Sequence, residues 1–139
     1  MKTFVDSNVL VYAEDLDAGE KRETAVKLIT RLWASDEGVV SIQVLQELFV
    51  TVTRKMPKPL SASRSMKIVE QYLTWTVVEN TGILTLGAID LASASRISFW
   101  DALIVHAAQV SGCDQLLTED LNHGQKFGNV QVRNPFVDS

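Results

Sequence analysis

The sequence of 139 residues has few of the features that stabilise secreted or membrane proteins. Its single cysteine, Cys113, cannot form a disulfide within the chain, which excludes a disulfide-rich secreted scaffold. No hydrophobic run reaches the roughly 18–20 residues that a membrane-spanning helix needs. The first twenty residues carry several acidic side chains and do not resemble a secretory signal. These absences predict a cytoplasmic protein with no membrane partner.

Proline and glycine are also scarce, and no linker, repeat or low-complexity stretch divides the chain. There are three prolines and seven glycines, while hydrophobic residues make up 46% of the chain and charged residues 22%. This composition is ordinary for a globular protein and excludes a disordered or fibrous one. We therefore predict a single domain spanning residues 1–139.

Short β-branched segments alternate along the chain with longer segments of helical period. The pattern predicts strands at residues 2–6, 39–42, 76–79, 115–118 and 130–132, and helices at 8–14, 20–35, 43–55, 61–75, 83–96 and 100–111. Strands that alternate with helices favour a parallel sheet covered on both faces. The predicted fold class is therefore α/β, with a central parallel sheet of four to five short strands.

Four acidic residues occupy positions that composition does not explain. Asp6 and Asp120 follow predicted strands, and ligands of open parallel sheets bind at the carboxyl ends of strands. Glu47 and Asp101 lie in the most apolar helical segments, on or beside the face that should be buried. Each acid also has a local explanation as a helix cap, a turn residue or a solvated side chain. Their joint placement instead predicts one carboxylate cluster.

Clustered carboxylates repel one another unless a cation lies among them. A set of oxygen ligands without supporting histidine or cysteine pairs suits Mg²⁺ or Mn²⁺ and argues against Zn²⁺. Such a cation can activate water and stabilise the charge on a phosphodiester. The acids therefore favour metal-dependent phosphodiester hydrolysis.

The charge balance is compatible with this chemistry. Thirteen basic and seventeen acidic residues give a net charge of −4, which argues against a protein that coats nucleic acid by electrostatics alone. If bound metal cancels the charge of four acids, thirteen acidic residues remain against thirteen basic ones. The net charge therefore does not exclude a nuclease.

Four segments, in order along the chain, together resemble the PIN domain family, and more closely the VapC-type toxins of bacterial and archaeal toxin–antitoxin pairs. They are FVDSNVLVYAED, VVSIQVLQELFVTVTRK, SFWDALIVHAA and LLTEDLNHGQ. The resemblance implies a three-layer α/β/α fold and an endoribonuclease that depends on Mg²⁺ or Mn²⁺. It also implies an RNA substrate, a small antitoxin protein as partner, and a homodimer.

The resemblance also implies roles for individual residues. The catalytic and metal-binding roles fall on Asp6, Glu47, Asp101 and Asp120. Supporting roles, which orient carboxylates or water, fall on Ser7, Asn8 and Thr118. Glu119 is a competing candidate for the fourth acid, and the T-x-D spacing of the family favours Asp120.

One basic stretch follows the Glu47 segment. Five basic residues and no acid lie between positions 48 and 69, and we predict that Arg54, Lys55 and Lys58 guide the RNA backbone. Solvated helix ends are the alternative interpretation of these charges.

Three other functions remain open at this point. The same active site would serve a PIN-domain RNA-processing nuclease that has no antitoxin. A PIN-like fold could also be a binding module without catalysis, although that function expects the acids to be lost. Phosphoryl transfer through an aspartyl nucleophile is disfavoured because Asp6-Ser7-Asn8 lacks the second acid of a D-x-D motif.

Overall fold

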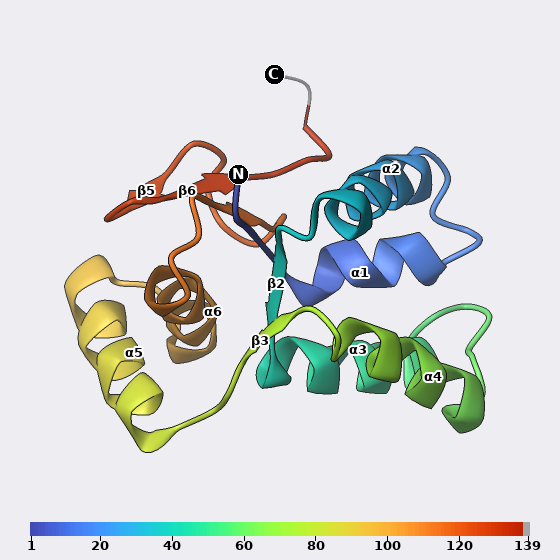
Figure 1. Cartoon of the computed structure of the whole chain (residues 1–139), viewed down its shortest axis with the longest axis horizontal. Coiled ribbons are helices and arrows are strands. Elements are labelled where there is room, and N and C mark those ends of the chain that lie inside the picture. Colours follow the sequence, from blue (N-terminus) through green and yellow to red (C-terminus); the bar gives the residue numbers. More distant parts are fainter. Residues whose placement is uncertain (138–139) are drawn as a thin grey trace.

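The computed structural model describes residues 1–137, which form six helices and a six-stranded sheet (Figure 1). The strands are β1 (Thr3–Val5), β2 (Gly38–Ser41), β3 (Thr76–Val78), β4 (Gln115–Leu117), β5 (Lys126–Phe127) and β6 (Val130–Arg133). The helices are α1 (Ser7–Glu14), α2 (Glu20–Ser35), α3 (Ile42–Arg54), α4 (Ala62–Tyr72), α5 (Gly82–Ser95) and α6 (Phe99–Val110). None of the helices in this part of the chain combines the length and hydropathy that crossing a membrane requires. The last two residues of the predicted domain lie outside the described residues.

The sheet has the strand order β3-β2-β1-β4-β6-β5. All neighbouring strands are parallel except β5 and β6, which pair antiparallel. Helices α5 and α6 lie on one side of the sheet and α1 and α2 on the other, with α3 and α4 next to α1 (Figure 1). This arrangement confirms the predicted α/β class and its mostly parallel sheet.

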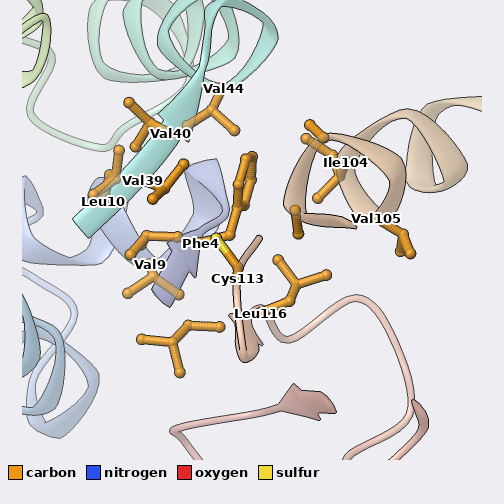
Figure 2. Close-up of a cluster of buried hydrophobic side chains, with 14 of the residues drawn as sticks. Phe4, Val9, Leu10, Val39, Val40, Val44, Ile104, Val105, Cys113 and Leu116 are labelled. Atoms are coloured by element: carbon orange, nitrogen blue, oxygen red, sulfur yellow. The ribbon is translucent and has the colours of Figure 1, made fainter. Parts of the chain in front are cut away.

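The hydrophobic core forms where the central strands meet helices from both sides. Phe4 of β1 and Leu116 of β4 are fully buried, and Figure 2 shows them among side chains of β2, α1, α3 and α6. Burying a side chain of this size stabilises a fold by about 1.5–3 kcal/mol. Side chains of the hydrophobic core cover both faces of β1, and all three of its residues are buried. The chain can therefore expose a polar group only after the strand ends.

Hydroxyl side chains set the start of several helices. Ser41 Oγ accepts a hydrogen bond from the backbone N–H of Val44 at 3.3 Å, and Ser98 Oγ accepts one from Asp101 at 3.1 Å. Ser61 and Thr81 cap α4 and α5 in the same way. A cap of this kind contributes about 1 kcal/mol because it satisfies a backbone donor that has no partner within the helix. Because Ser41 ends β2 and caps α3, the helix begins directly at the end of the strand. This places Glu47 of α3 close to the carboxyl edge of the sheet.

The structure differs from the prediction in two elements. The sheet has six strands rather than four to five, because the two-residue β5 is too short to show a period in the sequence. The predicted helix 61–75 ends at Tyr72, and Trp75 turns inward to pack against Gly38. A Cβ atom at Gly38 would lie 2.6 Å from the Trp75 ring, so this contact depends on glycine.

Candidate active site

The register of two neighbouring strands brings Asp6 and Thr118 together. Val5 of β1 pairs with Leu117 of β4, and the next residue of each strand faces the other at the carboxyl edge of the sheet. The Thr118 hydroxyl donates to Asp6 Oδ2 at 2.8 Å, and the Ser7 backbone N–H donates to Asp6 Oδ1 at 2.7 Å. Asp6 is only 5% exposed. It therefore caps α1 and also presents a carboxylate at the strand edge.

Asn8 links this pair to Asp120. Its side-chain amide donates to Asp120 Oδ2 at 3.1 Å and to the Thr118 hydroxyl oxygen at 3.3 Å. The Asp120 backbone N–H donates to the same hydroxyl at 3.1 Å. A single hydroxyl therefore connects the two strand-end acids, and Asn8 fixes the orientation of the second one.

The two remaining acids come from the first half of helices that begin near the same edge. Glu47 lies in α3, and the Ser7 hydroxyl donates to Glu47 Oε1 at 3.4 Å. Asp101 lies in the first turn of α6, where Ser98 caps its backbone N–H. The charges of Asp101 and Asp120 both act on Glu47, so acids from two helices and two strand ends share one region.

The electrostatics of the site disfavour the charged form of three of its carboxyls, those of Asp6, Glu47 and Asp120. Burial raises the pKa of Asp6 to about 7; the hydrogen bonds from Thr118 and Ser7 oppose this rise, and the charges of Glu47 and Asp120 add to it. Partial burial also raises the pKa of Glu47 and of Asp120. The charges of neighbouring acids raise both pKa values further. Within residues 1–137 no lysine or arginine forms an ion pair with any of the four. Nearby positive charge from a ligand would relieve this repulsion.

These residues fit a hard divalent cation that keeps part of its water. Among the described residues, no group of three or more acidic, histidine or cysteine side chains stands close enough together to hold a metal ion by itself. Mg²⁺ does not require such a group, because it is usually bound by one or two carboxylates together with waters and substrate phosphates. The donor set contains only oxygen, and its acids repel one another. Both properties suit Mg²⁺ or Mn²⁺.

Gln43 is a residue of this region that the sequence analysis missed. It is 6% exposed, and its side-chain amide donates to the Trp100 carbonyl oxygen at 3.5 Å, just before Asp101. It also hydrogen-bonds the Glu47 carboxylate, which lowers the pKa of that group. Gln43 therefore connects α3 with the start of α6. A polar residue one turn before Glu47, on the buried face of an apolar helix, was the available signal.

Glu119 and Asp120, the two candidates for the fourth acid, have different hydrogen-bond partners. Glu119 is hydrogen-bonded to Tyr12 and Lys21 of α1 and α2, whereas Asp120 is bonded to Asn8 and faces the charge of Asp101. Asp120 therefore lies with the other acids, whereas Glu119 is directed toward α1 and α2.

The basic stretch is only partly directed toward the acids. Lys55 lines a cleft of about 320 Å³ together with Ser7 and Glu47. Arg54 is exposed at the end of α3, and Lys58 forms an ion pair with Asp17 at 3.6 Å. Of the three predicted RNA-binding residues, Lys55 is the one that shares a cleft with a site acid.

The model of the PIN domain family matches residues 3–126. The chain belongs to the PIN domain family. Ribonuclease VapC24 of Mycobacterium tuberculosis is 26% identical over 142 residues, with 96% of each chain covered. This PIN domain superposes on a toxin–antitoxin complex from Klebsiella pneumoniae with a TM-score of 0.71 at 16% identity, covering 96% of this chain and 98% of that one. It also superposes on M. tuberculosis VapC20, a sarcin–ricin loop cleaving toxin, with a TM-score of 0.64 at 22% identity and 82% and 86% coverage.

Proposed function

We propose that this PIN domain is a metal-dependent endoribonuclease that serves as the toxin of a toxin–antitoxin pair. The observation that carries the proposal is the convergence of Asp6, Glu47, Asp101 and Asp120 at one edge of the sheet, within a PIN fold. The ribonuclease and toxin names of the similar proteins support the same activity. A non-catalytic binding module does not need four carboxylates whose burial and mutual repulsion make folding less favourable.

We propose the following division of labour among the residues. The four acids hold the cation, and Asn8, Ser7 and Thr118 fix the carboxylates of Asp120, Glu47 and Asp6 through the hydrogen bonds described above. When bound, Mg²⁺ or Mn²⁺ supplies an activated water and stabilises negative charge on the scissile phosphate. The protein's contribution is to keep the carboxylates ionised and oriented at the point where the RNA backbone arrives.

The whole described chain supports one such domain. The family model ends at residue 126, but β6 continues the sheet beyond it and pairs with β4, the strand that precedes Thr118. Residues after the match therefore brace a strand that carries the site, and we propose a single PIN domain over residues 1–139.

Metal removal tests the activity directly. Purified protein incubated with a structured RNA and Mg²⁺ or Mn²⁺ should produce defined fragments, and EDTA should abolish cleavage until excess metal restores it. The reason is that the carboxylates alone repel a phosphate. Fragment mapping by primer extension provides the readout. RNA that stays intact at every metal concentration would contradict the nuclease activity. It would favour the alternative function of a binding module without catalysis.

Lys55 should connect the RNA backbone with the acids. We expect Arg54→Glu combined with Lys55→Glu to weaken RNA binding about tenfold and to reduce the slope of log affinity against log salt by about 1, because fewer phosphates are neutralised. Filter binding at several salt concentrations measures both quantities. Lys27→Glu with Arg31→Glu, an exposed pair on α2, makes the same charge change as a control. An unchanged salt slope would favour solvated helix ends over an RNA path.

We also propose an antitoxin partner. A groove of about 660 Å³ between α3 and α4 is lined almost entirely by apolar side chains, and two of its residues, Gln46 and Val50, also line the cleft that contains Glu47. A partner segment in this groove would reach the acids. A nuclease of RNA processing without an antitoxin is the second candidate, and a short neighbouring gene for a DNA-binding protein would distinguish the two.

We also propose that the protein forms a homodimer. Ile83, Leu86 and Ile89 of α5 are exposed, as is Trp100 beside Asp101. A second copy would remove this apolar surface from water. We propose that the protein acts in the cytoplasm, where an RNA substrate is available.

A further inference from the structure

The loop that carries Asp120 is held from its other side by a polar network. Glu119 accepts a hydrogen bond from the Tyr12 hydroxyl at 2.6 Å and one from the Lys21 ammonium at 3.1 Å. Lys21 also donates to the Tyr12 hydroxyl oxygen at 3.3 Å. The three side chains therefore connect α1, α2 and the loop after β4, next to the site but outside the acid cluster.

Aromatic packing fixes the position of Lys21. Its ammonium lies 4.8 Å from the centre of the Tyr12 ring and 5.7 Å from that of Phe136, a residue after β6. The two rings meet edge to face with centres 5.0 Å apart. A cation near aromatic faces is attracted by their quadrupoles. Lys21 therefore interacts with three partners, namely Tyr12, Phe136 and Glu119. Its hydrogen bond with Glu119 raises the pKa of Lys21, which keeps it charged.

The peptide between Glu119 and Asp120 is consequently held at both ends. The Glu119 backbone N–H donates to Asn8 Oδ1 at 3.4 Å, while the Asn8 amide holds the Asp120 carboxylate. If Glu119 lost Tyr12 and Lys21, its side chain would be free to turn toward the cluster. A fifth carboxylate there would repel the others and compete with Asp120 for a cation.

We propose that Tyr12 and Lys21 are positioning residues that hold Glu119 outside the acid cluster and so fix Asp120 for metal binding. The inference rests on the proposed function. Of the ion pairs within residues 1–137, the one between Lys21 and Glu119 is the only one that involves a neighbour of a site acid. A partly exposed pair of this kind contributes little to the free energy of folding, so its main effect is expected at the site.

Mn²⁺ binding tests the proposal without requiring turnover. Titrations of wild type, Tyr12→Phe and Lys21→Met would be followed by the electron paramagnetic resonance of free Mn²⁺. We expect Mn²⁺ to bind about 3-fold more weakly to Tyr12→Phe and about 10-fold more weakly to Lys21→Met. These losses lie at or below the 10–100-fold range for direct partners of metal ligands, because Tyr12 and Lys21 act through Glu119. Lys21→Arg keeps the charge and should stay within about 3-fold of wild type.

Cleavage and melting separate positioning from a folding defect. In RNA cleavage, Lys21→Met should need about 10-fold more Mn²⁺ than wild type to reach half of its maximal rate. Once Mn²⁺ is saturating, its KM for RNA should be unchanged. Its melting temperature should stay close to that of wild type. Tyr72→Phe alters the chain's only other tyrosine, and Lys27→Met removes an exposed lysine of the same helix. Both controls should bind Mn²⁺ like wild type.

The possible failures can be told apart. Wild-type affinity in Tyr12→Phe and Lys21→Met, or an equal loss in Lys27→Met, would overturn the positioning role while leaving the nuclease intact. A wild-type protein that neither binds Mn²⁺ nor cuts RNA would overturn the proposed function and this inference with it.

Discussion

Replacing Asp6 with asparagine should lower the rate of RNA cleavage by more than about 100-fold without unfolding the protein. Removing residues that merely surround metal ligands typically costs 10–100-fold, and this change removes the charge of a proposed ligand. The shape is nearly unchanged. The asparagine oxygen can still accept from the Ser7 backbone N–H. Its amide would face the Thr118 hydroxyl, which already accepts from Asn8 and the Asp120 backbone N–H, so it would have to replace one of these two donors. Initial rates under excess Mn²⁺ measure the effect.

A matched control separates this loss from general damage. Asp90→Asn makes the same chemical change on an exposed position of α5 and should cleave like wild type. The two variants should be purified in parallel so that contaminating ribonuclease is recognised. Wild-type cleavage by Asp6→Asn would falsify the assignment of Asp6 as a ligand.

The metal-free protein should lose stability as the pH rises from about 4 to about 7. Asp6 has a pKa of about 7 in the folded chain, above the ordinary value of 3.8, so the folded state binds its proton more tightly than the unfolded state. The stabilisation from this proton is complete below pH 4 and is lost as the pH passes 7. Each pKa unit corresponds to about 1.4 kcal/mol, so the free energy of unfolding should fall by about 4 kcal/mol across this window.

Comparing wild type with Asp6→Asn isolates this contribution. Urea denaturation in EDTA at pH 5 and pH 8 gives the free energy of unfolding of each protein. Asp6→Asn has no carboxyl to ionise, so it should gain on wild type by about 2–3 kcal/mol between the two pH values and melt higher at pH 8. Mn²⁺ should restore wild-type stability at pH 8 because it binds only the folded site. Parallel curves for the two proteins would mean that Asp6 does not titrate in this window.

Under the proposed function, the same carboxyl would link stability and activity. A charge that destabilises the metal-free fold is retained at the position where a cation would be attracted most strongly. Thr118 and Ser7 reduce the cost through hydrogen bonds but do not remove it, because burial outweighs them. This balance is typical of functional sites, where folding is less favourable than it could be.

The elements with strong periods were predictable from sequence. Amphipathic periodicity located the helices to within a few residues, since this signal is local. The antiparallel β5 was missed because its two residues are too few to show a period, although it pairs with β6 across only two intervening residues. Trp75 was placed in a helix because nothing local reports its contact with Gly38.

The sequence alone determined the fold class and predicted the candidate acids, because strand and helix periods and the four family-like segments are properties of neighbouring residues. Only the tertiary structure decided that Asp120 rather than Glu119 joins the cluster, that Gln43 connects two of the acid-bearing helices, and that Lys55 rather than Lys58 shares the cleft. Each of these outcomes depends on hydrogen bonds and charges between residues far apart in the chain. Such distances are set by strand register and helix packing, and no local pattern encodes them.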